Sequence, residues 1–308
     1  MRGLRLVLAA AAARARVVVH VSSYGRRAEK VRTTLSSLLD QTHPPDVAYH
    51  SHACRDAARS QRLGCGWRSV DSAAWRRLCG SNCSDDGRGG PFAVPSKVRE
   101  IAYTAEDRGP TMRVLALLGP ARAGDLRDGD LVVVADDDKL YAPDVLARLA
   151  AFAGPRRAVG CRGWTYPRGH ATLDELAHST YGYAAMRYEN RGRRVARNGT
   201  RVRVLAGSDA YAFRWSRCVP ETVGRLLDAL DADERFFDDP IISSALRDCG
   251  AELLVAPCGE EPINREDAVG DYEAAPVGRS ATLDRRDALN IGVYKKLFFD
   301  RRRKAAPR

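Results

Sequence analysis

The chain has 308 residues and a formal net charge of +11. Hydrophobic residues make up 44% of it and charged residues 29%, which excludes a disordered chain and is typical of a globular protein with a substantial core. No apolar run reaches the roughly 18 residues that a transmembrane helix needs. A basic excess is common in nucleic-acid-binding proteins, but only 6 of the 50 basic residues are lysine and the arginines are spread along the chain. We interpret the charge as a compositional arginine bias and expect no nucleic-acid partner.

The N-terminus and the cysteines bear on the cellular compartment. Residues 1–15 contain early arginines, an apolar stretch and a small-x-small triplet, which together resemble a short signal peptide; the alternative is a flexible N-terminus before the first strand. Asn82 and Asn198 begin glycosylation sequons. An even number of cysteines permits disulfides, and the eight are Cys54, Cys65, Cys79, Cys83, Cys161, Cys218, Cys249 and Cys258. These features favour the lumen of the secretory pathway (endoplasmic reticulum or Golgi) over the cytoplasm.

Strands and helices alternate along most of the chain, which predicts an α/β fold with a central, mostly parallel sheet flanked by helices. The predicted strands are 16–23, 47–50, 98–102, 131–135, 159–164, 202–205 and 252–256. The predicted helices are 29–39, 111–118, 144–152, 220–230, 240–249 and 287–299, with a loop at 260–284. A cysteine- and arginine-rich segment at 52–95 lacks periodicity and is interpreted as an irregular insertion. We expect a single domain over 16–299 and a basic tail at 300–308.

Three consecutive carboxylates follow the most apolar strand, residues 131–135. Acids this close repel one another unless a cation offsets them. Because side chains alternate along a strand, we expect Asp136 and Asp138 to point to one side and Asp137 to the other. Two oxygen ligands on one side suit Mg²⁺ or Mn²⁺, and ligands of open α/β sheets bind beyond the carboxyl ends of strands. The alternative is a solvated acidic turn that caps the next helix.

Phosphate chemistry is the expected use of such a site, because a divalent ion on a few carboxylates commonly binds substrate phosphates as well. Two enzyme classes fit, namely nucleotide-sugar transfer and metal-dependent phosphate hydrolysis. A third hypothesis is a basic module that binds nucleic acid or another polyanion. That module would need clustered basic residues with aromatic residues between them, and it gives no reason for acids after a buried strand.

Residues 131–149 (LVVVADDDKLYAPDVLARL) resemble the metal-binding strand and following helix of GT-A-type glycosyltransferases, especially those similar to family 2. In that family an apolar strand ends in a D-x-D or D-D motif, followed by Tyr, a spacer, Pro and a helix. Tyr141, Pro143 and Asp144 hold these places here. Residues 17–46 are similar to the family's opening strand, loop, helix and turn.

Two further stretches extend the resemblance. Residues 106–110 together with Arg113 resemble a stretch of an algal and eukaryotic-type branch, in which Lys is more frequent at the place of Arg113. Residues 236–243 (FFDDPIIS) look like the family's E-D-v-x-l-s motif, with Asp238 in place of Glu. In pieces, the resemblance covers roughly three quarters of the chain, from 16 to 256.

The resemblance implies a GT-A fold and an inverting glycosyltransferase that uses Mn²⁺ or Mg²⁺ and a nucleotide-diphospho-sugar donor. Asp138 would be the direct metal ligand together with Asp136. Asp136 or Asp137 would also contact the ribose, or the metal through water. Ser22 and Tyr24, at the end of the first strand, would contact the nucleotide.

The remaining implied roles concern the diphosphate and the acceptor. Arg113, with Arg26 and Arg27 behind it, would pair with the diphosphate, since a guanidinium contacts phosphate in a bidentate way. Asp239 would be the base for the acceptor hydroxyl; the alternative is that Asp238 and Asp239 only cap the helix beginning at Pro240. The acceptor would be a hydroxyl of a glycan, lipid or protein, and a degenerate, inactive transferase is a further alternative. The acceptor-side residues would be Gly207, Asp209 and Asp238.

Overall fold

The structure is a computed structural model. It describes residues 15–23, 31–53, 66–67, 98–103, 109–165, 180–182, 193–207, 209–231, 233–259, 261–264, 289 and 291–300. Several predicted features lie outside these residues: nearly all of the signal-peptide-like segment, most of the 52–95 insertion, the tail beyond 300, and Tyr24, Arg26 and Arg27.

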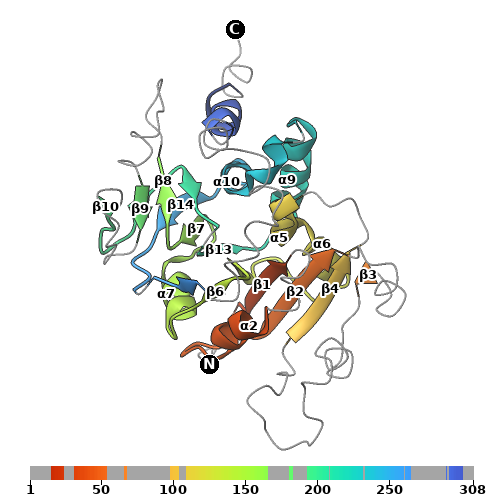
Figure 1. The fold of residues 1–308 in the computed structure, drawn as a ribbon, viewed down its shortest axis with the longest axis vertical. Coiled ribbons are helices and arrows are strands. Elements are labelled where there is room, and N and C mark those ends of the chain that lie inside the picture. The colour runs from red at the N-terminus through yellow and green to blue at the C-terminus, as the bar shows by residue number, and fades with distance from the viewer. Residues whose placement is uncertain are drawn as a thin grey trace, which may run out of the picture.

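A nine-stranded sheet forms the centre of the molecule, in the order β11-β14-β7-β13-β5-β1-β2-β4-β3 (Figure 1). Strands β5, β1, β2 and β4 pair in parallel, as do β7 and β14, while β13 is antiparallel to both of its neighbours. The strands are β1 Val17–Ser23, β2 Val47–Ala53, β3 Gly66–Trp67, β4 Val98–Tyr103, β5 Leu131–Ala135, β7 Arg157–Gly160, β11 Thr200–Arg201, β13 Ala210–Arg214 and β14 Glu252–Val255. The predicted α/β class with a mostly parallel central sheet is therefore confirmed.

Two small sheets accompany the large one. One has the order β10-β9-β8-β12 and the other pairs β15 with β6. Their strands are β6 Lys139–Leu140, β8 Gly163–Trp164, β9 Thr180–Gly182, β10 Arg193–Arg194, β12 Val204–Leu205 and β15 Ile263–Asn264. The pairing of β15 with β6 brings the segment after β14 next to the residues that follow the acidic triplet.

Helices cover both faces of the large sheet, giving three layers (Figure 1). Because side chains alternate along a strand, Val19 and Val21 pack with α2 and α7 on one face, whereas Val18 and Val134 pack with α5, α9 and α10 on the other. The helices are α2 Arg32–Leu39, α5 Met112–Leu115, α6 Leu118–Arg122, α7 Val145–Phe152, α9 Cys218–Asp228 and α10 Asp238–Asp248, with short helical turns at Gly109–Thr111, Glu234–Phe236 and Lys296–Asp300.

The structure corrects three predicted elements. The helix expected over 111–118 is broken into α5 and α6, because the amide of Leu117 donates to Val114 rather than continuing the regular ladder. The strand expected over 159–164 divides into β7 and β8, which belong to different sheets. Strand β13 is not among the predicted strands, yet it pairs along its length with β5.

Two disulfides join neighbouring elements within the described residues. Cys161 and Cys258 link the chain just after β7 to the chain just after β14, and Cys218 and Cys249 link α9 to the end of α10. Disulfides of this kind persist in oxidising compartments. Within the described part of the chain, no helix is long and apolar enough to cross a membrane.

Removing each disulfide should lower the free energy of unfolding by about 2–5 kcal/mol, because a crosslink restricts the unfolded chain. The Cys161–Cys258 pair closes a loop of 97 residues and the Cys218–Cys249 pair one of 31. The double alanine variant of the first pair should therefore lose about 1 kcal/mol more than that of the second. Urea unfolding of both variants measures this difference, and a larger loss from the second pair would contradict the loop-length explanation.

Candidate functional site

The acidic triplet forms a compact turn at the carboxyl end of β5. Strand β5 ends at Ala135, and one carboxylate oxygen from each of Asp136, Asp137 and Asp138 lies within 4.8 Å of the others. The prediction that Asp137 points away from its neighbours is therefore wrong, because strand alternation stops before the triplet begins. Asp137 and Asp138 are each only 2% exposed. Three convergent, mostly buried oxygen donors fit a hard divalent cation such as Mg²⁺ or Mn²⁺.

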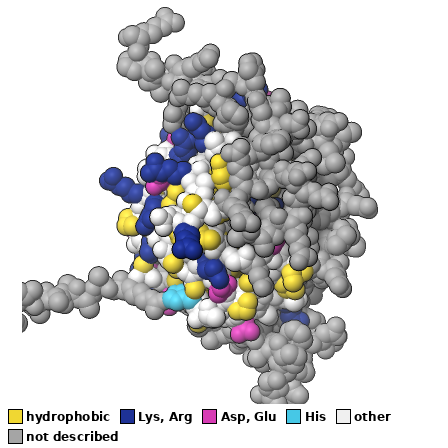
Figure 2. All heavy atoms as spheres, turned by 90° about the vertical axis from the view of Figure 1, so that its left-hand side faces the viewer, with side chains coloured by type: hydrophobic (Ala, Val, Ile, Leu, Met, Phe, Trp, Pro, Cys, Tyr) yellow, Lys and Arg dark blue, Asp and Glu magenta, His cyan; other side chains and the backbone are white. Residues whose placement is uncertain are grey.

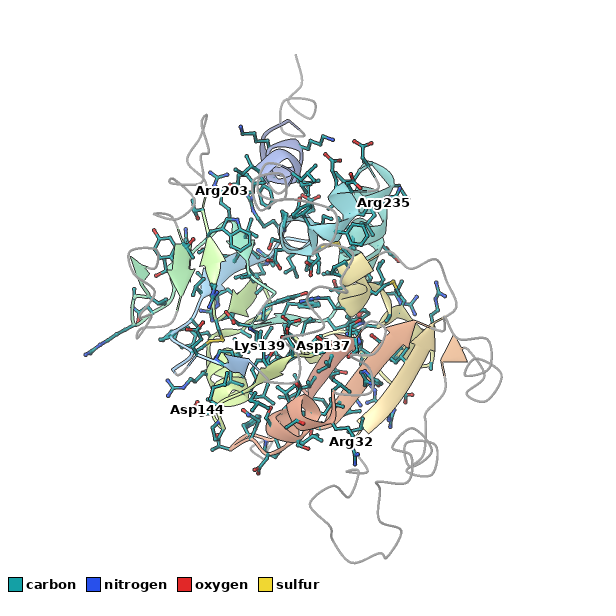
Figure 3. The ribbon with its side chains drawn as sticks, in the orientation of Figure 1. Arg32, Asp137, Lys139, Asp144, Arg203 and Arg235 are labelled. Carbon is teal, nitrogen blue, oxygen red and sulfur yellow. A yellow bond between two sulfur atoms is a disulfide. The ribbon has the colours of Figure 1, made fainter. Side chains whose placement is uncertain are left out.

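Side chains from two other elements hold this turn. Thr34 of α2 donates its hydroxyl to the carbonyl oxygen of Asp137 at 3.0 Å. The amide of Asp136 donates to the hydroxyl of Tyr141 at 2.7 Å, and that hydroxyl donates to the carbonyl oxygen of Asp209. Figure 3 shows Asp137 and Lys139 in the middle of the molecule, with Arg203 and Arg235 above them. The turn is thus braced from α2 and from the start of β13.

Asp209 contacts a second group of charged residues. Its carboxylate lies 3.0 Å from the Nε of Arg162, whose Nη2 lies 2.5 Å from Glu261. Arg162 follows directly on the Cys161 end of the first disulfide. The predicted acceptor-side residue Asp209 is therefore paired with Arg162, and its carbonyl oxygen accepts a hydrogen bond from Tyr141.

Arg113 connects the acidic triplet to the start of α10. Its Nη2 lies 3.6 Å from Asp136 and its Nε lies 3.1 Å from Asp238. Its Nη1 donates to the carbonyl oxygen of Gly207 at 3.0 Å, and its Nε also donates to Pro110. Burial by itself would lower the pKa of Arg113, but Asp238 and Asp136 outweigh that effect and raise it. The guanidinium is therefore a permanent positive charge between two acidic segments.

Asp239 is the neighbouring carboxyl group and has a different environment. It accepts a hydrogen bond of 2.6 Å from the amide of Gly207. Burial, and then the charge of Asp238, raise the pKa of Asp239 well above its usual value, although Arg113 opposes this. The helix begins at Asp238 with no side-chain hydrogen bond from its cap residue, Phe237. The structure thus gives Asp239 a contact with a loop amide rather than the predicted alternative role of helix cap.

Gly207 lies where a larger residue would have to displace its neighbours. A Cβ atom at this position would be 2.6 Å from Nη1 of Arg113 and 2.8 Å from a carboxylate oxygen of Asp239. The glycine therefore allows one peptide to bond both partners, its amide with Asp239 and its carbonyl oxygen with Arg113. Two of the protein's own charged side chains, Arg113 and Asp239, therefore approach this predicted acceptor-side residue closely.

The end of β1 is at the same edge of the sheet. Val21 is the partner of Ala135 in the parallel pairing of β1 and β5, so Ser22 comes next at the level where the acidic turn begins. Ser22 is partly exposed and Ser23 is buried. The structure therefore brings Ser22 to the edge that also carries Asp136.

Sequence reasoning missed three residues that organise this region. Arg162 pairs with Asp209. Tyr211 of β13 is buried near Arg113 and the acids, and burial raises its pKa well above the usual value for tyrosine. His20 hydrogen-bonds the main chain of Arg113. A histidine inside an apolar run, RVVVHVSS, was the signal available for His20.

Comparisons with known proteins give distant likenesses. No protein-family model and no curated protein sequence matches the chain. Among solved structures, it is similar to glucosyl-3-phosphoglycerate synthase from Mycobacterium tuberculosis in complex with Mn²⁺, uridine diphosphate and phosphoglyceric acid, at 14% identity and a TM-score of 0.43, covering 96% of this chain and 81% of that one. It is also similar to mannosyltransferase PcManGT from Pyrobaculum calidifontis in complex with GDP-Man and Mn²⁺, at 17% identity and a TM-score of 0.40, covering 93% of this chain and 70% of that one.

A third similar structure is 4-diphosphocytidyl-2C-methyl-D-erythritol synthase, at 11% identity and a TM-score of 0.42, covering 83% of this chain and 95% of that one. At these scores the likeness assigns no residue and no activity, and the function proposed below rests on the residues of this chain.

Replacing Gly207 with alanine should disrupt the site, because the new methyl group would displace Arg113 or Asp239. We expect a loss of roughly 1–3 kcal/mol in the free energy of unfolding from this overpacking, measured by urea unfolding. The matched control is Gly224→Ala in α9, where a Cβ meets nothing within 4 Å. That change should stabilise the helix by about 0.5–1 kcal/mol. Equal behaviour of the two variants would show that position 207 has spare room.

Proposed function

We propose that this protein is a divalent-metal-dependent glycosyltransferase of the GT-A type, which moves a sugar from a nucleotide-diphosphate donor to a hydroxyl acceptor. The observation that carries the proposal is the arrangement of two acidic groups at one edge of the sheet. One is the convergent triplet after β5, and the other is the Asp238–Asp239 pair at the start of α10, with Arg113 in contact with both. The first group can hold a metal and the second can supply a base.

The triplet would hold Mn²⁺ or Mg²⁺ through Asp138 and Asp136, with Asp137 beside them. A divalent ion there offsets the charge that develops on the leaving nucleoside diphosphate. Ser22, at the same edge, would contact the nucleotide. Arg113 keeps further N–H groups on its Nη atoms beyond those used within the protein, since a guanidinium carries five. Those groups would pair with the diphosphate.

Asp239 would take the proton of the acceptor hydroxyl. The hydroxyl oxygen would form a bond to the anomeric carbon of the donor while the bond to the diphosphate oxygen breaks, which gives inversion of the anomeric configuration. A carboxyl group whose pKa is raised accepts a proton more readily at neutral pH, and burial together with Asp238 raises the pKa of Asp239. The acceptor would lie near Gly207 and Asp238, on a glycan, lipid or protein.

The alternatives explain less of the site. A metal-dependent phosphohydrolase would use the triplet but gives no role to the bonded Gly207–Asp239 pair. A polyanion-binding module would use basic surface, and Figure 2 shows Lys and Arg side chains on one face of the molecule, with hydrophobic and acidic ones between them. Some exposed arginines are paired with acids, such as Arg201 with Glu252. The buried acids at the sheet edge have no use in such a module.

Donor binding should depend on the triplet. In a thermal-shift panel of nucleoside diphosphates and nucleotide sugars with Mn²⁺, at least one compound should raise Tm. At a concentration of 100 times its Kd, it should raise the free energy of unfolding by about 2.7 kcal/mol. The Asp138→Ala variant should lose this shift. The control is Asp128→Ala, an exposed residue in the turn before β5, at its opposite end. No stabilisation by any nucleotide, or an unchanged shift in Asp138→Ala, would contradict the proposal.

Asp239→Asn should keep donor binding and lose transfer. Asparagine keeps an oxygen that can accept from the Gly207 amide but cannot take the acceptor proton, so kcat should fall by about 10²–10⁴-fold while nucleotide affinity stays near wild type. In the wild type, kcat/KM should fall as the pH is lowered through the raised pKa of Asp239, because the protonated carboxyl is no base. Asp248→Asn, at the other end of α10, is the control. Wild-type turnover in Asp239→Asn would remove it from this role.

A further inference from the structure

A fully buried histidine lies in the middle of β1, a strand at the centre of the sheet. His20 belongs to β1, and its neighbours Val19 and Val21 on either side are fully buried valines. His20 itself has no solvent exposure. Burying a polar ring costs free energy unless its nitrogens are hydrogen-bonded. The bonds that His20 makes therefore decide what it does in this position.

Both ring nitrogens of His20 have partners, and the chemistry of the partners determines the tautomer. Nδ1 lies 2.6 Å from the carbonyl oxygen of Arg113, and Nε2 lies 2.8 Å from the hydroxyl of Ser51 on β2. A carbonyl oxygen can only accept, so Nδ1 carries the hydrogen and Nε2 accepts from Ser51. Ser51 is also fully buried. The neutral imidazole thus satisfies both bonds, and it links the main chain of Arg113 to two strands of the sheet.

The Arg113 carbonyl is directed at the sheet because the helix ends there. In a regular helix the amide of Leu117 would reach the carbonyl of Arg113. Here Leu117 donates to Val114 at 3.2 Å, and α5 ends at Leu115. The break in the helix therefore has a structural use, since it leaves the Arg113 carbonyl oriented toward His20.

We propose that His20 and Ser51 are positioning residues for Arg113, holding its main chain at the place from which its guanidinium joins Asp136 to Asp238. The importance of this position for catalysis rests on the function proposed above. The guanidinium distances are 3.6 Å to Asp136 and 3.1 Å to Asp238, so a shift of the Arg113 main chain would break contacts on both sides. The two acidic groups would then lose their common cation.

The surroundings of His20 keep its ring in the required form. Burial, together with the nearby positive charge of Arg113, lowers the pKa of His20 to about 4, although the bond to the Arg113 carbonyl opposes this. The imidazole is consequently neutral at physiological pH, which preserves the Nε2 lone pair for Ser51. A cationic side chain at position 20 would instead place a like charge beside Arg113.

Two amide replacements separate the bonds of His20. The asparagine nitrogen is the same number of bonds from Cα as Nδ1, and the glutamine nitrogen the same number as Nε2. His20→Asn should therefore keep a donor for the Arg113 carbonyl, whereas His20→Gln should lose it. Both bury one amide in an apolar strand, so much of the stability cost should be common to the two variants.

The main measurement is solvent exchange of the Arg113 Nε–H proton by NMR, which needs no substrate. We expect exchange to rise by about tenfold or more in His20→Gln, and His20→Asn to stay closer to wild type. In transfer assays, kcat should fall by about 10- to 100-fold in His20→Gln and recover in His20→Asn. Equal exchange in the two variants, or exchange unchanged in His20→Gln, would overturn the proposal.

A second pair of variants covers the case in which His20→Gln does not fold. Ser51→Ala removes the partner of His20 Nε2 and should also speed Arg113 Nε–H exchange. Ser51→Thr keeps the hydroxyl, so its exchange rate should be close to that of the wild type. Wild-type exchange in Ser51→Ala would overturn the positioning role. Absence of nucleotide binding by the wild type would instead count against the transferase proposal alone, because the exchange measurement is independent of it.

Discussion

The repulsion among acids at one edge of the sheet is the constraint around which this site is built. Asp136–Asp138 follow β5, and Asp238 and Asp239 begin α10, so five carboxyl groups converge in largely buried surroundings. Arg113 contacts one acid in each group. Removing one partner of such a buried pair costs about 3–5 kcal/mol, because the other charge is left without compensation. The guanidinium therefore ties the two groups together as well as neutralising part of their charge.

That cation is held in place by parts of the chain distant in sequence. The Gly207 peptide is 94 residues from Arg113 and bonds its guanidinium, and His20 is 93 residues away and bonds its main chain. Gly207 can do this only because it has no Cβ. Each contact restrains a different part of the arginine. The consequence is that the separation between the acidic triplet and Asp239 depends on the sheet, a loop and two helices at once.

The sequence predicted the elements whose signal is local. Residues 131–135 are apolar throughout, which is sufficient for a buried strand, and the α/β order follows from the alternation of such strands with amphipathic helices. Strand β13 escaped prediction because its residues 210–214 alternate small and aromatic side chains after a glycine-containing loop. Its extended form comes from pairing with β5 and β7 on both sides. No local pattern records such a pairing.

The site residues also divide into those with a local sequence signal and those placed by long-range contacts. The acidic triplet and Asp238–Asp239 were identified because their chemistry is visible in consecutive residues. The geometry of the triplet was not predicted correctly, because side chains alternate only while the strand continues, and β5 ends at Ala135. The partners of Arg113 and the Cys161–Cys258 pairing depend on which strands are neighbours in the sheet. The valines around His20 likewise do not indicate which carbonyl oxygen its ring will contact, which in the structure is that of Arg113.

The charge of the whole chain and the charge of the site have opposite signs. The chain carries a net +11, yet five carboxyl groups meet at the sheet edge and Arg113 contributes only one positive charge against them. Burial and the charge of Asp238 raise the pKa of Asp239, which shows that a further negative charge at this edge is unfavourable. A diphosphate approaching the bare edge would meet net negative charge, and such an approach is unfavourable at short range in a low-dielectric environment. A divalent cation on the triplet would offset two of these negative charges, so under the proposed function a diphosphate should bind more readily with the metal than without it.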